Sequence, residues 1–258
     1  MTYCVGMVLE RGLVLMSDTR TNSGVDNIST FRKMFHWHVP GERMIAVMCA
    51  GNLATTQAVI SQLEERTKEP DDRDNSLLRG RTMFNVATEI GRLLRSTIND
   101  AQRSNGEAGK GRFTASMILA GQIEGMQPRL FMIYPEGNFI EASWDTPFFQ
   151  IGETKYGRPI LIRGYDRDMS FEDAVKLLMV SFDSTIKANL SVGLPLDLLV
   201  IGKDEFAPLH QHRVTGNDGY FDTISSSWGA SLRSALDALP SYSFDSPGGV
   251  EEDPPKSP

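Results

Sequence analysis

Blocks of strand-like segments alternate with pairs of helix-like segments along this chain, and that order restricts its fold more than any other feature. The first fifty residues contain four strand-like segments in two pairs, at 3–9, 13–17, 33–39 and 44–49, of which 33–39 alternates between polar and apolar residues. Turn residues, Gly12 in the first pair and Pro40-Gly41 in the second, separate the two segments of each pair. We therefore expect two β-hairpins at the start of the chain.

A helical period replaces this pattern after Gly51-Asn52 and predicts a helix that ends before Pro70. A second helix follows, with one apolar face between Met83 and Ile98. The remaining segments that we expect are strands at 114–120, 129–134, 139–142, 197–202 and 210–214, and helices at 156–163, 170–188 and 225–239. Strands in blocks and helices in pairs indicate layered antiparallel sheets rather than a βαβ winding.

We therefore predict an α+β fold, a four-layer αββα sandwich of two antiparallel sheets flanked by helix pairs. Residues 1–239 are expected to form a single domain that includes an added C-terminal helix. Residues 240–258 are rich in Ser, Pro, Gly and acidic residues, which is typical of a flexible tail.

Composition excludes several classes of partner. A net charge of −7 gives no basic surface for nucleic acid or an anionic membrane. No apolar run approaches the roughly 20 residues that a membrane-spanning helix needs, and the start of the chain lacks the pattern of a signal peptide. Two cysteines, Cys4 and Cys49, are too few for a disulfide framework. The expected location is the cytoplasm.

Three polar residues in the β-rich start could carry chemistry. Thr2 has a hydroxyl nucleophile and, once Met1 is removed, a free α-amine that can take the hydroxyl proton. Asp18 ends an expected strand and is also compatible with a simple turn residue. Lys33 begins a strand among apolar neighbours, either as a rim residue with a buried stem or as a partly buried charge that needs a partner.

Other motifs favour structural roles. His36 and His38, and likewise His210 and His212, would share one face of a strand, but no third ligand lies nearby in the sequence. Cys4 is interpreted as a small buried hydrophobic residue. The segment 106–111 is rich in glycine but lacks the strand and helix that flank a phosphate-binding loop. We expect no metal site.

The combined motifs resemble the proteasome β-subunit and HslV family of N-terminal nucleophile hydrolases. The resemblance rests on Thr2, on the Asp-x-x-x-x-x-Gly turn at 18–24, on Arg32-Lys33-Met34-Phe35, and on the Ala50-Gly51 turn before the first helix. It extends from Thr2 to about Lys203. The added C-terminal region and the particular residues of the motifs are most similar to Anbu, a branch of bacterial proteasome homologues.

The resemblance implies a threonine-type peptidase that hydrolyses peptide bonds. Thr2 Oγ would attack the carbonyl, and Lys33, paired with Asp18, would stabilise the developing charge. The backbone N–H of Gly51 would form the oxyanion hole. Asn22 would bind the substrate backbone. The residues that would line the pocket for the side chain directly before the cut are Thr21, Phe31, Cys49 and Leu53. They would make this pocket moderately small and apolar, which favours uncharged side chains.

The chain departs from the family pattern around the amine of Thr2. Glu153 or Thr154 stands where the family has a supporting serine. Asn189 occupies the position of a supporting aspartate, and Ser191 lies one residue from a second serine. These changes predict an active but slow or narrowly selective enzyme.

The resemblance also implies partners. The substrate would be a peptide or an unfolded protein, and the chemistry needs no metal or cofactor. Self-assembly into a ring or open spiral is expected, with a possible ATPase or other delivery partner. Two alternatives stay open: a weakly active or inactive scaffold or binding subunit of such an assembly, and an amidase that acts on a non-protein substrate.

Overall fold

The computed structural model describes residues 2–22, 28–68, 76–105, 113–242 and 244, with the backbone alone at 22, 28 and 105. The chain divides into two compact units, one that ends at Asp218 and one that begins at Gly219. The second unit contains one described helix, α5 (Gly219–Asp237), which begins six residues before the predicted start at 225. The predicted single domain over 1–239 and the tail from 240 stay predictions.

Two five-stranded antiparallel sheets form the centre of the first unit. The first sheet has the order β10-β1-β2-β11-β12, with the bounds β10 (Phe148–Gly152), β1 (Tyr3–Leu9), β2 (Gly12–Asp18), β11 (Leu196–Gly202) and β12 (His210–Val214). The second has the order β5-β6-β7-β8-β9, with the bounds β5 (Met34–Val39), β6 (Arg43–Gly51), β7 (Ala115–Ile123), β8 (Arg129–Ile133) and β9 (Phe139–Glu141). A short two-stranded ribbon joins β3 (Arg20–Asn22) to β4 (Ile28–Thr30).

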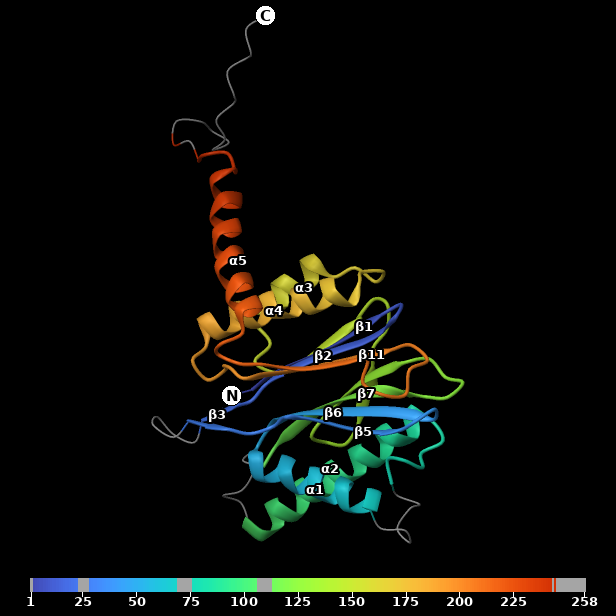
Figure 1. Ribbon diagram of the computed structural model, residues 1–258. Coiled ribbons are helices and arrows are strands. Elements are labelled where there is room, and N and C mark those ends of the chain that lie inside the picture. Colours follow the sequence, from blue (N-terminus) through green and yellow to red (C-terminus); the bar gives the residue numbers. More distant parts are fainter. Residues whose placement is uncertain (1, 23–27, 69–75, 106–112, 243, 245–258) are drawn as a thin grey trace, which may run out of the picture. The chain divides into compact units, whose positions relative to one another are not determined.

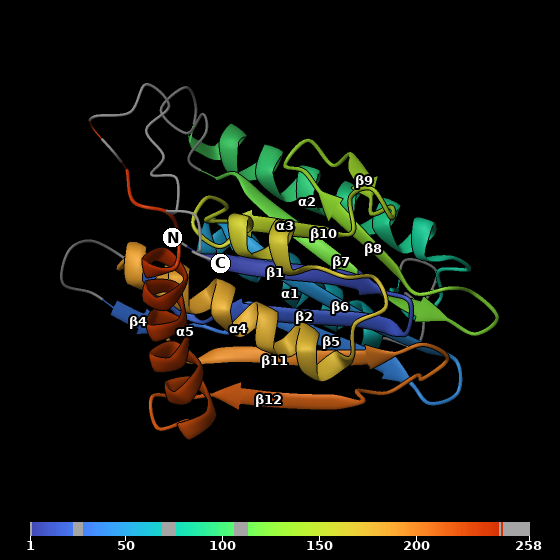
Figure 2. The same cartoon turned by 90° about the horizontal axis from the view of Figure 1, so that it is seen from above.

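Helix pairs cover the outer faces of the two sheets, as Figure 1 shows. The helices α1 (Leu53–Lys68) and α2 (Met83–Asn105) pack on the second sheet. The helices α3 (Arg158–Gly164) and α4 (Phe171–Ala188) lie over the first sheet, and Figure 2 shows them across its strands. This arrangement confirms the predicted four-layer αββα sandwich.

Apolar side chains fill the space between the two sheets. The alternating residues Leu13 and Leu15 of β2 face Met48 and Ile118 of the second sheet within one buried cluster. Gly6 allows a close approach here, because a Cβ at this position would lie 2.8 Å from Leu130 Cδ1. Tight packing around β1, the strand that follows Thr2, therefore fixes the two sheets against each other.

Each predicted helix and strand has a counterpart in the structure, whereas one further strand and one two-stranded ribbon were not predicted. The strand β10 was not predicted, although it forms the edge of the first sheet and places Gly152 opposite Tyr3. The ribbon of β3 and β4 was also not predicted. The predicted helix start at Ser170 is confirmed, since its hydroxyl accepts the Asp173 N–H. Among the described residues, no helix is long and apolar enough to cross a membrane.

Candidate active site

Thr2 lies immediately before β1, and the backbone around it is held on both sides. The Glu153 N–H donates to the Thr2 carbonyl over 2.6 Å. The next amide, the Tyr3 N–H, donates to Asp18 Oδ1 over 2.9 Å. Thr2 itself is partly exposed and lines a cleft. The backbone of Thr2 is thus fixed while its side chain stays accessible.

Gly152 and Tyr3 make this position of Thr2 possible. Gly152 has φ of +85°, and a Cβ there would lie 2.0 Å from the Thr2 carbonyl oxygen, so only glycine fits. The Tyr3 hydroxyl lies 2.7 Å from Ser181 Oγ and accepts a hydrogen bond from Gln150 over 2.7 Å. Burial raises the pKa of Tyr3 to about 12. Tyr3 is thus a neutral anchor for the start of β1.

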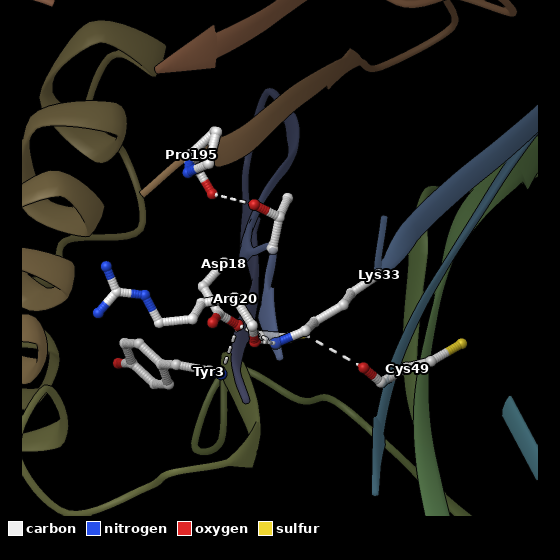
Figure 3. Close-up of polar contacts among 8 residues, drawn as sticks. Tyr3, Asp18, Arg20, Lys33, Cys49 and Pro195 are labelled. Atoms are coloured by element: carbon white, nitrogen blue, oxygen red, sulfur yellow. Dashed lines mark hydrogen bonds and ion pairs between the residues drawn. The ribbon is translucent and has the colours of Figure 1, made fainter. Parts of the chain in front are cut away.

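Asp18 and Lys33 form a buried ion pair, drawn in Figure 3. Lys33 Nζ donates to Asp18 Oδ1 over 2.8 Å and to the Arg20 carbonyl over 2.5 Å. Asp18 is 0% exposed and Lys33 is 6% exposed. Burial raises the pKa of the Asp18 carboxyl, while the Lys33 charge opposes that rise. The pair settles the two sequence alternatives: Lys33 is a buried charge with a partner, and Asp18 is that partner.

Gly51 ends β6 at the same cleft. Its φ is +114°, and a Cβ there would lie 2.5 Å from the Thr114 carbonyl oxygen. Asn52 follows and caps α1, because its Oδ1 accepts the Thr55 N–H over 3.0 Å. The Cys49 N–H donates to the Lys33 carbonyl over 2.9 Å, which ties the end of β6 to the start of β5. The turn is therefore held rigidly beside Lys33.

The cleft has a volume of about 590 Å³. Its lining residues are Thr2, Thr21, Arg32, Lys33, Phe35, Cys49, Ala50, Gly51, Asn52, Leu53, Ala54, Thr56, Gln57, Ile60 and Gly152. The structure thus brings together Thr2, Lys33 and Gly51, and with them three of the predicted pocket residues.

Of the predicted substrate-binding residues, one does not line the cleft and one has a side chain that is not described. Phe31 is not among the lining residues of the cleft, and its neighbour Arg32 lines it instead. The prediction for the side chain of Asn22 lies outside the described residues. Sequence reasoning gave Arg32 no role, although its charge next to Lys33 was visible in the motif.

The residues predicted to support the amine form a connected group. Asn189 Nδ2 donates to Glu153 Oε2 over 2.9 Å, and the Lys155 N–H donates to Glu153 Oε1 over 3.0 Å. Asn189 Oδ1 accepts the Ser191 N–H over 3.0 Å. Glu153 is 7% exposed, whereas Thr154 is exposed to solvent. Of the two candidates for the serine position, Glu153 is therefore the buried one.

The remaining motifs do not form a second site in the part of the chain that is described. No group of three or more His, Cys, Asp or Glu suitable for a metal ion occurs there. His212 instead contacts Asp218 over 2.9 Å. Cys4 and Cys49 are both buried free thiols, and burial raises the pKa of Cys49 to about 12. The glycine-rich segment 106–111 lies outside the described residues.

Comparisons with known proteins find similarity to proteasome subunits along most of the chain. The family model described as proteasome subunit matches residues 2–201. The proteasome subunit beta of Methanopyrus kandleri is 23% identical over 207 residues, which cover 79% of this chain and 88% of that protein. The proteasome subunit beta of Haloquadratum walsbyi is 24% identical over 204 residues, which cover 79% of this chain and 74% of that protein.

Solved structures named Anbu are more similar in sequence to this chain than these two proteasome subunits are. Anbu (ancestral beta-subunit) from Yersinia bercovieri is 45% identical with a TM-score of 0.87, over 94% of this chain and 100% of that one. The chain in the helical assembly of the Anbu complex from Pseudomonas aeruginosa is also 45% identical. Its TM-score is 0.88, and the match covers 95% of this chain and 99% of that one. The chain therefore belongs to the proteasome subunit family, with the N-terminal nucleophile hydrolase fold and a likeness to its Anbu members that extends over almost its whole length.

Proposed function

We propose that this chain is a threonine-type peptidase that hydrolyses peptide bonds with Thr2 as the nucleophile after removal of Met1. The observation that carries the proposal is the buried Asp18–Lys33 ion pair, whose lysine lines the same cleft as Thr2 and Gly51. A buried cation is costly to desolvate unless it is paired. A cation held at the edge of an open cleft is suited to stabilise negative charge that develops there.

In the first step, Thr2 Oγ attacks the scissile carbonyl, and the α-amine of the same residue takes the hydroxyl proton. The oxyanion forms at the Gly51 turn, where its backbone N–H would donate to it. The C–N bond then breaks and the amine product leaves with the proton, so that an ester to Thr2 remains. Water hydrolyses this ester, which releases the acid and restores the hydroxyl and the amine.

Lys33 has a second role in this mechanism. A free α-amine has an ordinary pKa of about 8, and a nearby positive charge lowers it toward neutrality. More of the amine is then in the basic form that accepts a proton. Asp18 keeps Lys33 in place, and Glu153 with Asn189 fixes the backbone of Thr2 from the opposite side.

Hydrolysis of fluorogenic peptides tests this function. Protein whose N-terminus is shown by mass spectrometry to be Thr2 is expected to release the fluorophore, and Thr2→Ala is expected to release none. Unchanged turnover by Thr2→Ala would overturn the proposal. Absence of turnover by wild type across the panel would favour the scaffold alternative, and hydrolysis of simple amides alone would favour an amidase.

Self-assembly is the second part of the proposal. The Anbu complex of Pseudomonas aeruginosa is a helical assembly, and this chain matches 99% of that chain at 45% identity. We infer that copies of this chain form a spiral or ring in which the clefts take up peptide segments. Light scattering is expected to give a mass of several chains, and a monomeric mass at micromolar concentration would contradict the inference. The buried free thiols Cys4 and Cys49 fit a reducing compartment such as the cytoplasm.

A further inference from the structure

The charged residues that line the cleft are all positive. Arg32 and Lys33 are the two charged lining residues, and no aspartate or glutamate lines the cleft among the residues that the structure describes. The remaining polar lining groups, such as Thr2, Thr56 and Gln57, are neutral. The cleft therefore presents a positive potential to any group that enters it.

The two cations differ in their partners. Lys33 is 6% exposed and is paired with Asp18 over 2.8 Å, and it also donates to the Arg20 carbonyl. Arg32 is exposed, and no ion pair joins it to an acid within the described parts of the chain. Its charge reaches a neighbouring side chain, since it contributes, after burial and His38, to a lowered pKa of His36. Arg32 is thus the cation that an incoming group can pair with.

A guanidinium has a planar set of donors that matches a carboxylate better than any other side chain does. Three apolar side chains of this pocket, Phe35, Cys49 and Leu53, can contact an aliphatic stem. A glutamate or aspartate side chain has the required stem and a carboxylate at its end. An uncharged amide of the same shape would fill the same space without the ionic pairing.

We propose that Arg32 determines specificity in this cleft and selects peptides with an acidic residue directly before the scissile bond. The proposal rests on the proposed peptidase function and narrows its substrate class. It also revises the expectation of uncharged side chains, which was based on Thr21, Phe31, Cys49 and Leu53 without Arg32. Arg32 contacts the substrate side chain rather than the reacting bond.

Isosteric substrate pairs test this assignment. Fluorogenic peptides that differ only by Glu or Gln, or by Asp or Asn, before the cut are compared with N-terminally processed protein. We expect kcat/KM to favour the acidic member about tenfold, as for one charge-assisted pair at a partly exposed site. Arg32→Gln is expected to remove the preference, and Arg32→Glu to reverse it toward a lysine peptide.

The control variant is Arg81→Gln, which makes the same change of charge at an exposed residue outside the cleft. It should retain the preference for the acidic peptide. Raising the salt concentration should reduce the preference of the wild type, because screening weakens a partly exposed pair. Equal kcat/KM for Glu and Gln peptides, or a preference that survives in Arg32→Gln, would overturn the proposal.

A binding measurement separates this inference from the proposed function. Full-length Thr2→Ala is titrated with the labelled Glu and Gln peptides, and the fluorescence anisotropy is recorded. Tighter binding of the Glu peptide that is lost in Thr2→Ala with Arg32→Gln supports the role of Arg32 even if the wild type hydrolyses nothing. Equal binding of both peptides would contradict the role of Arg32 even if the wild type is an active peptidase.

Discussion

Asn189 donates a hydrogen bond to Glu153 over 2.9 Å, and this bond connects the C-terminal end of α4 to the chain segment that holds Thr2. The Glu153 N–H in turn donates to the Thr2 carbonyl. The resemblance had marked both residues as departures from the family pattern. The structure pairs them with each other, because the Asn189 amide donates the hydrogen bond that the Glu153 carboxylate accepts.

Asn189→Asp tests this relationship. Two carboxylates at hydrogen-bonding distance cannot both ionise easily, so the pKa of one of them rises in the folded state. We expect kcat/KM at pH 8 to fall about 10–100-fold, by analogy with other supporting shells. A raised folded pKa gives stability that is present at low pH and is lost as the pH rises through it. The melting temperature and kcat/KM of Asn189→Asp, each compared with the wild type at the same pH, should therefore approach the wild-type values as the pH falls.

The matched control for that change is Asn217→Asp, which introduces the same charge at an exposed residue. Its activity and melting temperature should follow the wild type at every pH. If Asn189→Asp behaved like this control, the bond between Asn189 and Glu153 would not position Thr2.

Lys33→Ala should have separate effects on stability and on activity. Removing the lysine leaves Asp18 buried without its charged partner, which typically destabilises a fold by about 3–5 kcal/mol. Activity should fall by about 10³-fold or more, because both oxyanion stabilisation and the basic form of the amine are affected. Denaturant unfolding and peptide hydrolysis measure the two effects. Lys68→Ala, at an exposed lysine at the end of α1, is the control and should change neither.

Asp18→Asn complements the lysine variant, because it keeps the side-chain shape and removes the negative charge. The Tyr3 N–H retains an acceptor in this variant, whereas Lys33 loses its counter-ion. We expect a folded protein with strongly reduced hydrolysis. Full activity in Asp18→Asn would show that the charge of Asp18 is not needed to hold Lys33.

Gly51→Ala should be more harmful than the same change at Gly41. Both glycines have positive φ, at +114° and +74°, so that alanine is strained at either position. A Cβ at Gly51 would lie 2.5 Å from the Thr114 carbonyl oxygen, whereas a Cβ at Gly41 has nothing within 4 Å. Gly51→Ala is therefore expected to lose about 10²–10³-fold in kcat. Gly41→Ala should show only a lower melting temperature, and equal kcat for the two variants would contradict the role of Gly51.

Two groups shape the acid side of the pH dependence of activity. Protonation of the Thr2 α-amine causes the first loss of kcat/KM, and protonation of the Asp18 carboxyl causes a further loss at lower pH. Burial raises the pKa of Asp18 above its ordinary value of 3.8, so this further loss should begin above that pH. Protonation favours the folded state for a group whose folded pKa is raised, so this group does not cause acid unfolding. Activity should therefore decline on acidification before the fold is lost, and it should return on neutralisation. Circular dichroism at each pH provides the comparison, and coincident loss of structure and activity would contradict this assignment.

The first hairpin was predictable from sequence, whereas the strand β10 was not. The strands β1 and β2 are apolar runs separated by turn residues, so the hairpin was evident. Four of the five residues of β10 are buried, and its edge position depends on the pairing with β1. The contacts that place Glu153 beside Thr2 follow from this strand, so periodicity alone could not reveal them.

The residues of the site and the pairing of Asp18 with Lys33 were predictable, but the other contacts of the site were not. Thr2, Asp18, Lys33 and Gly51 were identified by the resemblance of their motifs. The anchoring of Tyr3 by Ser181 and the donation from Lys33 to the Arg20 carbonyl depend on segments that are far apart or irregular in sequence. Arg32 was overlooked because a charge next to a motif lysine has no distinguishing pattern until the cleft is known.

Covalent labelling of Thr2 tests the central claim most directly. Processed wild type is incubated with an electrophilic peptide inhibitor, and the intact mass and the N-terminal fragment are then measured by mass spectrometry. We predict one adduct for each chain, located on Thr2, that is absent in Thr2→Ala and strongly slowed in Lys33→Ala. An adduct that persists in Thr2→Ala, or that lies on another residue such as Cys49, would contradict the assignment of Thr2 as the nucleophile.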